Sequence, residues 1–382
     1  MMRSLTLLSI AALAAGVGAC GDKLTTDPPL TPVVTDTNVP ALDRTVFVSG
    51  LSNPWDLVFL PNGEMLFTER VGTLRLRRTS GTLITVAQPT DVVQGGEGGM
   101  MGLAIDPQFA SNRYVYTCFS SNAGGATDQR VVRWVLAADG ASLSARRDIV
   151  TGLPYANGGR HSGCRPRFAP DGNLWIGTGD AAVGTNPQDL KSLGGKVLRV
   201  TRDGDAAPGN PAISGADARI YTYGHRNVQG IAFQPVTGAA YGVEQGPSFD
   251  DKVNALVSGA NSGWNPVPGY NESVSMTDLA RYPAAMRAFW SSGSPARGTS
   301  GGGFISGTAW KAWDGALVIG QLSGTKLVVL TFNANGSMKA ATPVFADQNT
   351  RLRTPVQGPD GALYVTTDVA SGGGEIWRIA PK

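Results

Sequence analysis

Short apolar stretches alternate with polar turns in a pattern that recurs about six times along the chain. Each copy has an apolar strand, a turn rich in Pro, Asp-Gly or Asn-Gly, and a second apolar strand, as in residues 57–67. Such dipeptides are strong hairpin signals. The turns are anchored at Pro61, Pro107, Pro170, Pro235, Trp313 and Pro359. Anchors spaced about 45 to 80 residues apart match one four-stranded blade plus insertions. The pattern predicts an all-β, six-bladed β-propeller with four-stranded antiparallel blades. A pair of β-sandwiches or a β-helix would not predict this turn chemistry at blade-sized intervals.

The starts of the predicted inner strands carry a second regularity. In a propeller these strands line the channel and run in one direction, so residues just before them gather at one face. Five blades offer polar, aromatic or ionisable side chains there, and the blade anchored at Trp313 offers only glycines 301–303. The side chains are Asn53, Trp55, Glu97, His161, Arg226, Asn227, Arg351 and Arg353. This recurrence predicts a funnel-shaped site over the channel. We also expect residues 45–49 to pair with residues 375–379 and close the ring.

Composition agrees with this fold class. The 382 residues include 51 Gly and 24 Pro, and only 16% are charged, which favours short strands over long helices. The formal net charge is +3 and no run of Lys or Arg occurs, so we expect no nucleic-acid partner.

Residues 1–20 have the pattern of an export signal, with Arg3 before a short apolar stretch. The stretch ends in Val17-Gly18-Ala19-Cys20, which resembles a bacterial lipobox, although a plain secretory signal has the same general pattern. We therefore expect a signal peptide at 1–20, a flexible tether at 21–44 and the propeller domain at 45–382. The protein would be exported, periplasmic or at the cell surface, with a lipid on Cys20 as its only membrane contact.

The remaining cysteines, Cys118 and Cys164, both fall in predicted strands. In an oxidising compartment they could form a disulfide, and they could equally be buried free thiols.

The chain has only two histidines, His161 and His225, and each lies in a glycine-rich polar motif. Histidine is the side chain best suited to proton transfer near neutral pH, so imidazole acid–base chemistry has two candidate positions.

Several motifs, in order along the chain, resemble the soluble quinoprotein aldose/glucose dehydrogenases, the glucose/sorbosone dehydrogenase family. They are Glu97-Gly-Gly-Met-Met-Gly-Leu-Ala, His161-Ser-Gly-Cys-Arg, Tyr223-Gly-His-Arg-Asn-Val-Gln-Gly, Glu244-Gln-Gly-Pro, Gly263-Trp264 and Arg351-Leu-Arg353. The resemblance spans residues 46 to 380. It implies a six-bladed propeller that uses pyrroloquinoline quinone (PQQ) and calcium to oxidise the C1 hydroxyl of an aldose to a lactone. Electrons would pass to an external acceptor.

The resemblance also implies a role for individual residues. His161 matches the general base that acts while hydride passes to PQQ, and Asp180 matches a carboxylate that orients it. Arg226 matches the cation beside the reactive quinone carbonyl. The cofactor contacts would be Glu97, Arg226, Asn227, Arg351 and Arg353. Carbonyl oxygens of Gly246 and Pro247 would bind the cofactor-associated calcium, and Asp250 and Asp251 a second, structural calcium. His225 matches no catalytic position and is expected to give structural support.

These residue types also have ordinary structural uses. Asp180 could cap a turn, the arginine pair could lie on an exposed edge, and the two acids at 250–251 could be solvated. The chain also departs from the glucose enzymes at four positions. Ser323 stands where those enzymes have a cofactor-contacting lysine, with Lys326 nearby, and Ser262 replaces a tyrosine of the second calcium site. Glu97 replaces a glutamine, and Arg160 an acid.

Two other functions remain open. A propeller of this kind can be a non-catalytic module that binds a glycan or a protein. It can also be a metal-dependent hydrolase of the lactonase type, for which Glu97 and Asn227 could serve as ligands. The arginines of the same funnel would repel that metal ion.

Overall fold

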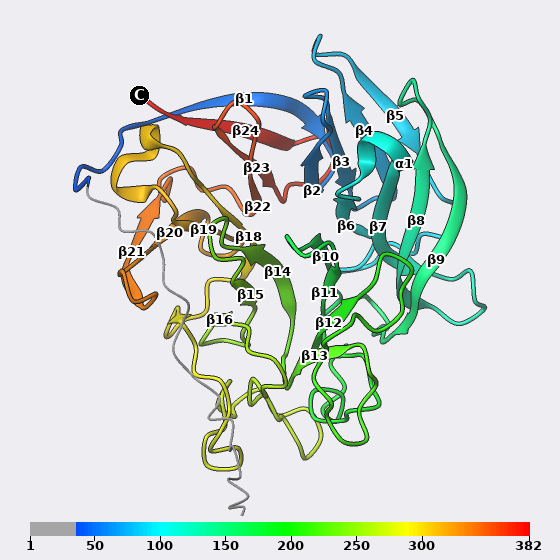
Figure 1. Ribbon diagram of the computed structural model, residues 1–382, viewed down its shortest axis with the longest axis vertical. Coiled ribbons are helices and arrows are strands. Elements are labelled where there is room, and N and C mark those ends of the chain that lie inside the picture. The colour runs from blue at the N-terminus through cyan, green and yellow to red at the C-terminus, as the bar shows by residue number, and fades with distance from the viewer. Residues whose placement is uncertain (1–35) are drawn as a thin grey trace, which may run out of the picture.

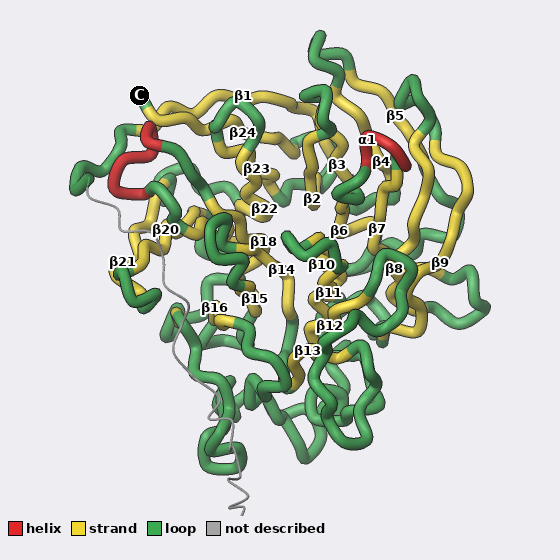
Figure 2. The backbone as a smooth tube through the Cα atoms, in the orientation of Figure 1, coloured by secondary structure: helices red, strands yellow, loops and turns green. Residues whose placement is uncertain are grey.

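The computed structural model describes residues 36–382 and consists almost entirely of strands. They form six four-stranded antiparallel sheets, arranged as blades around a common centre (Figure 1). This confirms the predicted six-bladed β-propeller. The predicted signal peptide and Cys20 lie outside the described residues. Helical structure in the described part is confined to α1 (Phe109–Asn112) and the 3-10 segment η1 (Thr308–Trp313), as Figure 2 shows. No helix among residues 36–382 is long and apolar enough to cross a membrane.

Each blade contributes one strand to each of four concentric positions. The inner strands, for blades 1 to 6, are β2 (Pro54–Phe59), β6 (Met100–Ile105), β10 (Gly163–Phe168), β14 (Val228–Phe233), β18 (Thr299–Phe304) and β22 (Leu352–Gln357). The second strands are β3 (Met65–Glu69), β7 (Tyr114–Ser121), β11 (Leu174–Thr178), β15 (Ala240–Glu244), β19 (Leu317–Gln321) and β23 (Leu363–Thr367). The third strands are β4 (Thr73–Arg77), β8 (Asp128–Leu136), β12 (Lys196–Val200), β16 (Lys252–Ala255), β20 (Lys326–Phe332) and β24 (Gly374–Pro381). The outer strands are β5 (Leu83–Ala87), β9 (Leu143–Leu153), β13 (Ile220–Tyr223), β17 (Trp290–Ser291), β21 (Met338–Val344) and β1 (Leu42–Leu51).

The recurring turn motif builds the hairpin between the first two strands of a blade. In four blades the turn glycine has a φ between 75° and 82°, a backbone conformation that residues with a Cβ atom rarely adopt; these are Gly63, Gly172, Gly315 and Gly361. Backbone hydrogen bonds close the turns, for example from the amide of Ala169 to the carbonyl of Asn173 at 3.0 Å. The turn chemistry thus repeats in space as it repeats along the chain.

The two ends of the folded chain meet in blade 6. Strand β1 runs antiparallel to β24, with Val46 opposite Trp377 and Val48 opposite Ile376. Figure 1 shows the blue β1 lying along the red β24. The pairing of residues 45–49 with 375–379 is therefore confirmed, and the strand begins at Leu42. It supplies the outer strand that blade 6 lacks and joins the ring through backbone hydrogen bonds.

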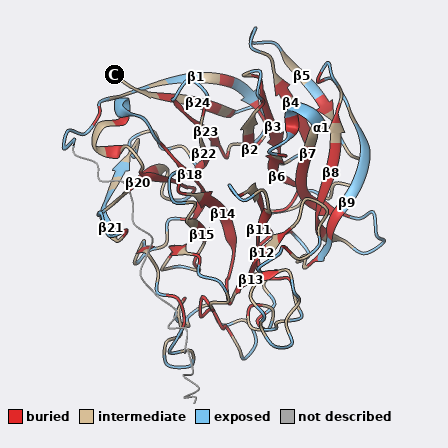
Figure 3. Ribbon diagram, in the orientation of Figure 1, coloured by how far each residue is buried: buried red, intermediate tan, exposed pale blue. Residues whose placement is uncertain are grey.

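The apolar core lies between the blades. Six clusters of buried side chains occur among the described residues; five combine residues from two neighbouring blades, and the other combines blades 2 and 3 with Trp55 of blade 1. The inner three strands of each blade are mostly buried, whereas outer strands such as β9 and β21 are largely exposed (Figure 3). Burial of apolar area contributes roughly 25 cal/mol per Å². The contacts between blades, and not only those within a sheet, therefore fix the ring.

A buried cation connects the inner strands of several blades. Arg165 on β10 is 1% exposed, and its guanidinium forms an ion pair with Asp56 of blade 1 at 2.8 Å. It also donates to the backbone carbonyl of Gln229 in blade 4 and to the hydroxyl of Thr354 in blade 6. The Cζ atom of the guanidinium lies 3.9 Å from the centre of the Trp55 ring. Four blades are thus tied together by one side chain.

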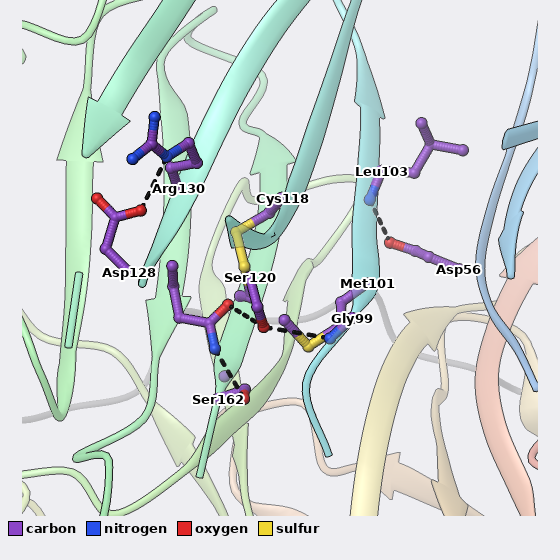
Figure 4. Close-up of a disulfide and its surroundings, with 12 residues drawn as sticks. Asp56, Gly99, Met101, Leu103, Cys118, Ser120, Asp128, Arg130 and Ser162 are labelled. Carbon is purple, nitrogen blue, oxygen red and sulfur yellow. Dashed lines mark hydrogen bonds and ion pairs between the residues drawn. A yellow bond between two sulfur atoms is a disulfide. The ribbon is translucent and has the colours of Figure 1, made fainter. Parts of the chain in front are cut away.

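A disulfide between Cys118 and Cys164 links β7 of blade 2 to β10 of blade 3 (Figure 4). Of the two possibilities left open by the sequence, the structure has the bonded pair. Close by, Gln129 donates to Ser162 at 2.8 Å and accepts from Ser120 at 3.1 Å. The segment that carries His161 is therefore anchored to blade 2 covalently and through side-chain hydrogen bonds.

Replacing both cysteines, Cys118→Ser with Cys164→Ser, should lower the free energy of unfolding. The bond closes a loop of 46 residues, and the chain-entropy model gives up to about 4 kcal/mol for such a loop. Urea unfolding followed by fluorescence measures the change. Wild-type protein unfolded with a reductant present should approach the midpoint of the variant. Equal midpoints for the oxidised wild type and the variant would contradict the expectation.

Candidate active site

The imidazole of His161 stands at the start of blade 3 and is fixed on one side by a carboxylate. His161 precedes β10, has a φ of 53° and is 2% exposed. Its Nδ1 lies 2.7 Å from Oδ1 of Asp180, which follows β11, and 2.9 Å from the hydroxyl oxygen of Tyr270. With Nδ1–H facing the carboxylate, Nε2 keeps its lone pair and can accept a proton. The arrangement suits a general base.

Asp180 is fully buried and has a complete set of hydrogen-bond donors. Its Oδ2 accepts from Trp264 Nε1 at 2.9 Å and from the Tyr270 hydroxyl at 2.7 Å, while Oδ1 also accepts from the amide of Ala182 at 2.8 Å. Burial raises the pKa of Tyr270 far above its usual value, with the charge of Asp180 adding to the effect, so the phenol stays protonated and donates. Asp180 and its partners therefore hold the His161 ring in one orientation. The Asp180–His161 hydrogen bond favours this orienting role over that of a simple turn cap.

Arg226 stands at the start of blade 4, close to the same pocket. Its guanidinium donates to the carbonyls of Gln245 at 3.0 Å and Gly246 at 2.9 Å, and to Oε1 of Glu272 at 2.5 Å. The other oxygen of Glu272 accepts from Arg160 at 2.5 Å. Burial opposes ionisation of Glu272, but the two arginines hold the pKa of its carboxyl below the usual value. One carboxylate thus bridges the two cations beside the pocket.

A pocket of about 260 Å³ lies between these groups. It is lined by Glu97, Arg160, His161, Arg226, Gln245, Gly246, Pro247, Ala296, Gly298 and Ser323. The lining comes from blades 2 to 5, mainly from segments that precede inner strands, as the offset of the sequence pattern predicts. Blade 5 contributes Ala296 and Gly298, which lie upstream of glycines 301–303.

Asn227 connects the pocket to the channel. It is fully buried; its side-chain oxygen accepts from the amide of Gly163 at 3.0 Å, and its Nδ2 donates to Glu97 at 3.0 Å and to Gln245 at 3.1 Å. Gln229, two residues on, lies 3.4 Å from the same Glu97 carboxylate. The carboxylate of Glu97 is thus held by two side-chain amides.

The arginine pair of blade 6 surrounds a single carboxylate. Arg353 and Arg351 lie 2.9 Å and 3.2 Å from Oδ2 of Asp368, Arg70 lies 4.0 Å from its other oxygen, and Asn53 donates to it at 2.9 Å. Burial opposes ionisation of Asp368, but the arginines hold the pKa of its carboxyl well below its usual range. Three guanidinium groups face one carboxylate, which leaves a surplus of positive charge. Arg353 is buried and Arg351 is exposed, so the surplus charge favours an anion site although one of the two arginines is open to solvent.

The donors around the funnel fit a cofactor that bears carboxylates. Among residues 36–382, the buried Nε atoms of Arg70, Arg226 and Arg353 have no hydrogen-bond partner. An N–H group left without an acceptor in a buried place is costly, and a ligand oxygen would relieve it. Arg353 also donates to Gln229 at 3.0 Å, so the arginine cluster joins the network of Asn227 and Glu97. PQQ, a tricarboxylate, suits this donor set.

The residues expected for calcium divide into two groups. Gly246 and Pro247 line the pocket, and the Gly246 carbonyl already faces a cation, the guanidinium of Arg226. Asp251 instead accepts backbone N–H groups from Gly246 at 2.9 Å, Arg297 at 2.6 Å and Thr299 at 3.1 Å. Asp250 accepts the hydroxyl of Ser291 at 2.8 Å. The described part of the chain contains no cluster of three or more His, Cys, Asp or Glu side chains that could hold a metal ion. Gly246 and Pro247 therefore lie on the pocket lining, with the Gly246 carbonyl bound to Arg226, whereas the oxygens of Asp251 are bonded to backbone N–H groups.

His225 is fully buried behind the pocket, with both ring nitrogens occupied. Nδ1 lies 2.8 Å from Glu244 and Nε2 lies 2.9 Å from the hydroxyl of Thr222. Glu244 also accepts the backbone N–H of Arg226 at 2.7 Å. His225 therefore has the position of structural support, as expected.

Some site residues escaped the sequence pattern. Tyr270 and Glu272 come from the long segment between β16 and β17, which lies outside the blade repeat. Arg70 and Asp368 follow β3 and β23, the second strands of their blades, and only the inner-strand offset was considered. Ser323 lines the pocket at the expected place, and Lys326 is not part of the lining.

Comparison with known proteins identifies the relatives of this chain. The family model for Glucose / Sorbosone dehydrogenase matches residues 51–378. The aldose sugar dehydrogenase YliI of Escherichia coli (strain K12) is 32% identical over 343 residues, which cover 87% of this chain and 91% of that protein. The crystal structure of the soluble aldose sugar dehydrogenase from Escherichia coli in the apo form is similar with a TM-score of 0.79 and 29% identity, over 90% of this chain and all of that one. The PQQ-bound form of the aldose sugar dehydrogenase from Streptomyces coelicolor gives a TM-score of 0.74 and 28% identity, again over 90% and 100% of the chains.

Removing the hydroxyl of Tyr270 with Tyr270→Phe should lower the free energy of unfolding by roughly 1.5 to 3 kcal/mol, because a buried carboxylate loses one of its donors. Tyr282→Phe is the control, since Tyr282 lies on the same segment but does not contact Asp180. Urea unfolding of both variants measures the difference. If both variants unfold at the same urea concentration, the hydroxyl does not support Asp180 as described.

Proposed function

The chain belongs to the glucose/sorbosone dehydrogenase family, and on that premise we propose that it is a PQQ-dependent aldose dehydrogenase that oxidises the C1 hydroxyl of a sugar to the lactone. The observation that carries this proposal is the position of a carboxylate-oriented imidazole, His161, and a buried guanidinium, Arg226, on the lining of one pocket. A base and a fixed cation on one cavity are what removal of a proton and a hydride from one carbinol requires.

His161 would take the proton of the C1 hydroxyl on Nε2. The alkoxide that develops is a far better hydride donor than the alcohol, so the base lowers the barrier to oxidation. Asp180 would stabilise the imidazolium that results, because it holds Nδ1–H at 2.7 Å. The oxidation removes two electrons and two protons in total: one proton leaves to His161, and the other leaves with the electrons as hydride.

Basic residues on two sides of the funnel would hold the cofactor. Arg351, Arg353 and Arg70 would bind its carboxylates, while Arg226 and Asn227 would contact its ring. PQQ, when bound, supplies the two-electron acceptor for the hydride. Arg226 is 5% exposed and shielded from water, so its charge acts more strongly on developing negative charge than a surface arginine would.

A calcium ion would bind together with the cofactor at the carbonyls of Gly246 and Pro247. Carbonyl oxygens are hard ligands that calcium prefers, and both residues line the pocket. The sugar would lie toward Glu97, Arg160 and Glu272, whose charged groups can accept from and donate to its hydroxyls.

We also propose that the protein is exported, periplasmic or at the cell surface, and held by a lipid on Cys20. Its electrons would then go to an acceptor outside the cytoplasm. The pattern of residues 1–20 supports this placement.

The two alternative functions have less support. A lactonase-type metal site would need Glu97 and Asn227 to face a cation, but Asn227 directs its amide nitrogen at Glu97. A module that only binds a glycan or protein has no use for a buried Asp180–His161 pair. Neither alternative is favoured by any contact in the pocket.

The proposal is tested by titrating the purified apo-protein with PQQ and calcium while following quinone absorbance, and then adding an aldose with an electron-accepting dye. We expect saturable cofactor binding and sugar-dependent dye reduction that requires PQQ. Absence of dye reduction with every aldose and sugar alcohol tried, despite bound PQQ, would refute the dehydrogenase activity. Lactone hydrolysis without PQQ would favour the hydrolase.

His161→Gln should lower kcat by roughly a hundredfold to ten-thousandfold, the usual contribution of a general base. PQQ affinity should stay close to that of the wild type, because the arginines that hold the cofactor are untouched. Steady-state dye reduction and the absorbance titration measure the two quantities. A kcat within about tenfold of the wild-type value would mean that His161 is not the base.

A further inference from the structure

The ammonium group of Lys252 is surrounded by a cage of oxygen atoms next to Glu244. Lys252, on β16, is 1% exposed. Its Nζ donates to the backbone carbonyls of Ser262 at 3.0 Å and Met276 at 2.7 Å, and to the hydroxyl of Thr277 at 3.1 Å. The carboxylate of Glu244 lies 3.8 Å away.

The number of hydrogen-bond acceptors in this cage and the negative charge beside it suit an ammonium group. An ammonium group has three N–H donors and no acceptor, and three oxygens accept from it here. Burial lowers the pKa of Lys252, and the carboxylate of Glu244 opposes that shift. Burial in turn opposes ionisation of Glu244, but the charge of Lys252 and the hydrogen bond with His225 lower the pKa of its carboxyl to about 2. A positive and a negative charge therefore neutralise each other inside the protein.

The neighbouring acids leave no place for a metal ion at this position. The carboxylate of Asp251 already accepts hydrogen bonds from backbone N–H groups. Asp250 lines a separate pocket of about 190 Å³, but Lys252 and Arg287 line it as well. Two cations beside one carboxylate repel a divalent ion.

We propose that the ammonium group of Lys252 takes the place of a second, structural cation in this fold, so that blade 4 needs no metal ion for its stability. The tethered charge neutralises Glu244, whose other oxygen accepts the backbone N–H of Arg226. This inference concerns stability and does not depend on the proposed activity. The only calcium that the protein would then require is the one proposed to bind with the cofactor.

The first test uses the wild-type protein without PQQ, so that no calcium ion can bind together with the cofactor. Thermal unfolding is recorded in EDTA and in millimolar calcium chloride. We expect the two Tm values to agree within about 1 °C, because a ligand that does not bind the folded state cannot stabilise it. A calcium-dependent rise of several degrees would overturn the proposal.

The second test removes the charge with Lys252→Met, a side chain of similar length. The buried carboxylate of Glu244 then lacks its cation, and Tm should fall by roughly 10 °C. Lys191→Met, which removes an exposed lysine, serves as the control. Equal Tm values for the two variants would overturn the proposal.

A third variant, Lys252→Glu, reverses the charge and creates a pair of buried carboxylates. Calcium should then raise its Tm by several degrees more than it raises that of Lys252→Met, because the oxygen cage again needs a cation. The same response of both variants to calcium would contradict the proposed nature of the cage. The wild-type measurement still decides the question if either variant fails to fold.

Discussion

The geometry of the site depends on the guanidinium group of Arg165, which is buried in the channel below it. Transfer of such a cation from water costs several kcal/mol, and the ion pair with Asp56 and the stacking on Trp55 offset that cost. Its remaining bonds reach Gln229 in blade 4 and Thr354 in blade 6. Burial lowers the pKa of Arg165 to about 9, which still leaves it a cation at neutral pH. Because the partners lie on four blades, the charge stays satisfied only when the blades keep their relative positions. The same strands begin beside His161, Arg226 and Arg351, so the channel holds these residues in register.

Above this channel the charges are distributed unevenly. Arg226 and Arg160 both pair with the carboxylate of Glu272. The three arginines around Asp368 likewise have a single carboxylate between them. Each cluster has more positive than negative charge, while the imidazole of His161 adds no cation unless it is protonated. A funnel of this kind attracts an anionic ligand and holds it beside the base. It also stabilises negative charge that develops during reaction. The surplus of arginine over carboxylate therefore serves both binding and chemistry in the proposed dehydrogenase.

The fold was predictable from the sequence because it rests on local signals that repeat. The turn glycines, the apolar strands and the constant offset before each inner strand all lie within short windows, and they placed at one face His161 and Arg226, which line one pocket in the structure. Contacts made by Tyr270 were not predictable in this way. Its hydroxyl reaches Asp180 across 90 residues, from an insertion without periodicity. The Asp250–Asp251 pair shows another limit of the sequence, since two adjacent acids suggest a metal ion without revealing their hydrogen-bond partners. Only the packing of Arg297 and Thr299 against Asp251 reveals that its oxygens are already used.

The carboxylate of Glu244 connects the structural and the chemical parts of blade 4. One of its oxygens accepts the backbone N–H of Arg226. The other lies 2.8 Å from Nδ1 of His225 and 3.8 Å from the ammonium group of Lys252. A carboxylate in this position needs a permanent positive neighbour, because an uncompensated buried charge would either take up a proton or draw in water. Lys252 on the adjacent strand supplies that charge as part of the chain itself. A metal ion would supply it only when its concentration is high enough for binding. On the proposal made for Lys252, the backbone at Arg226 would be held through Glu244 without a divalent ion.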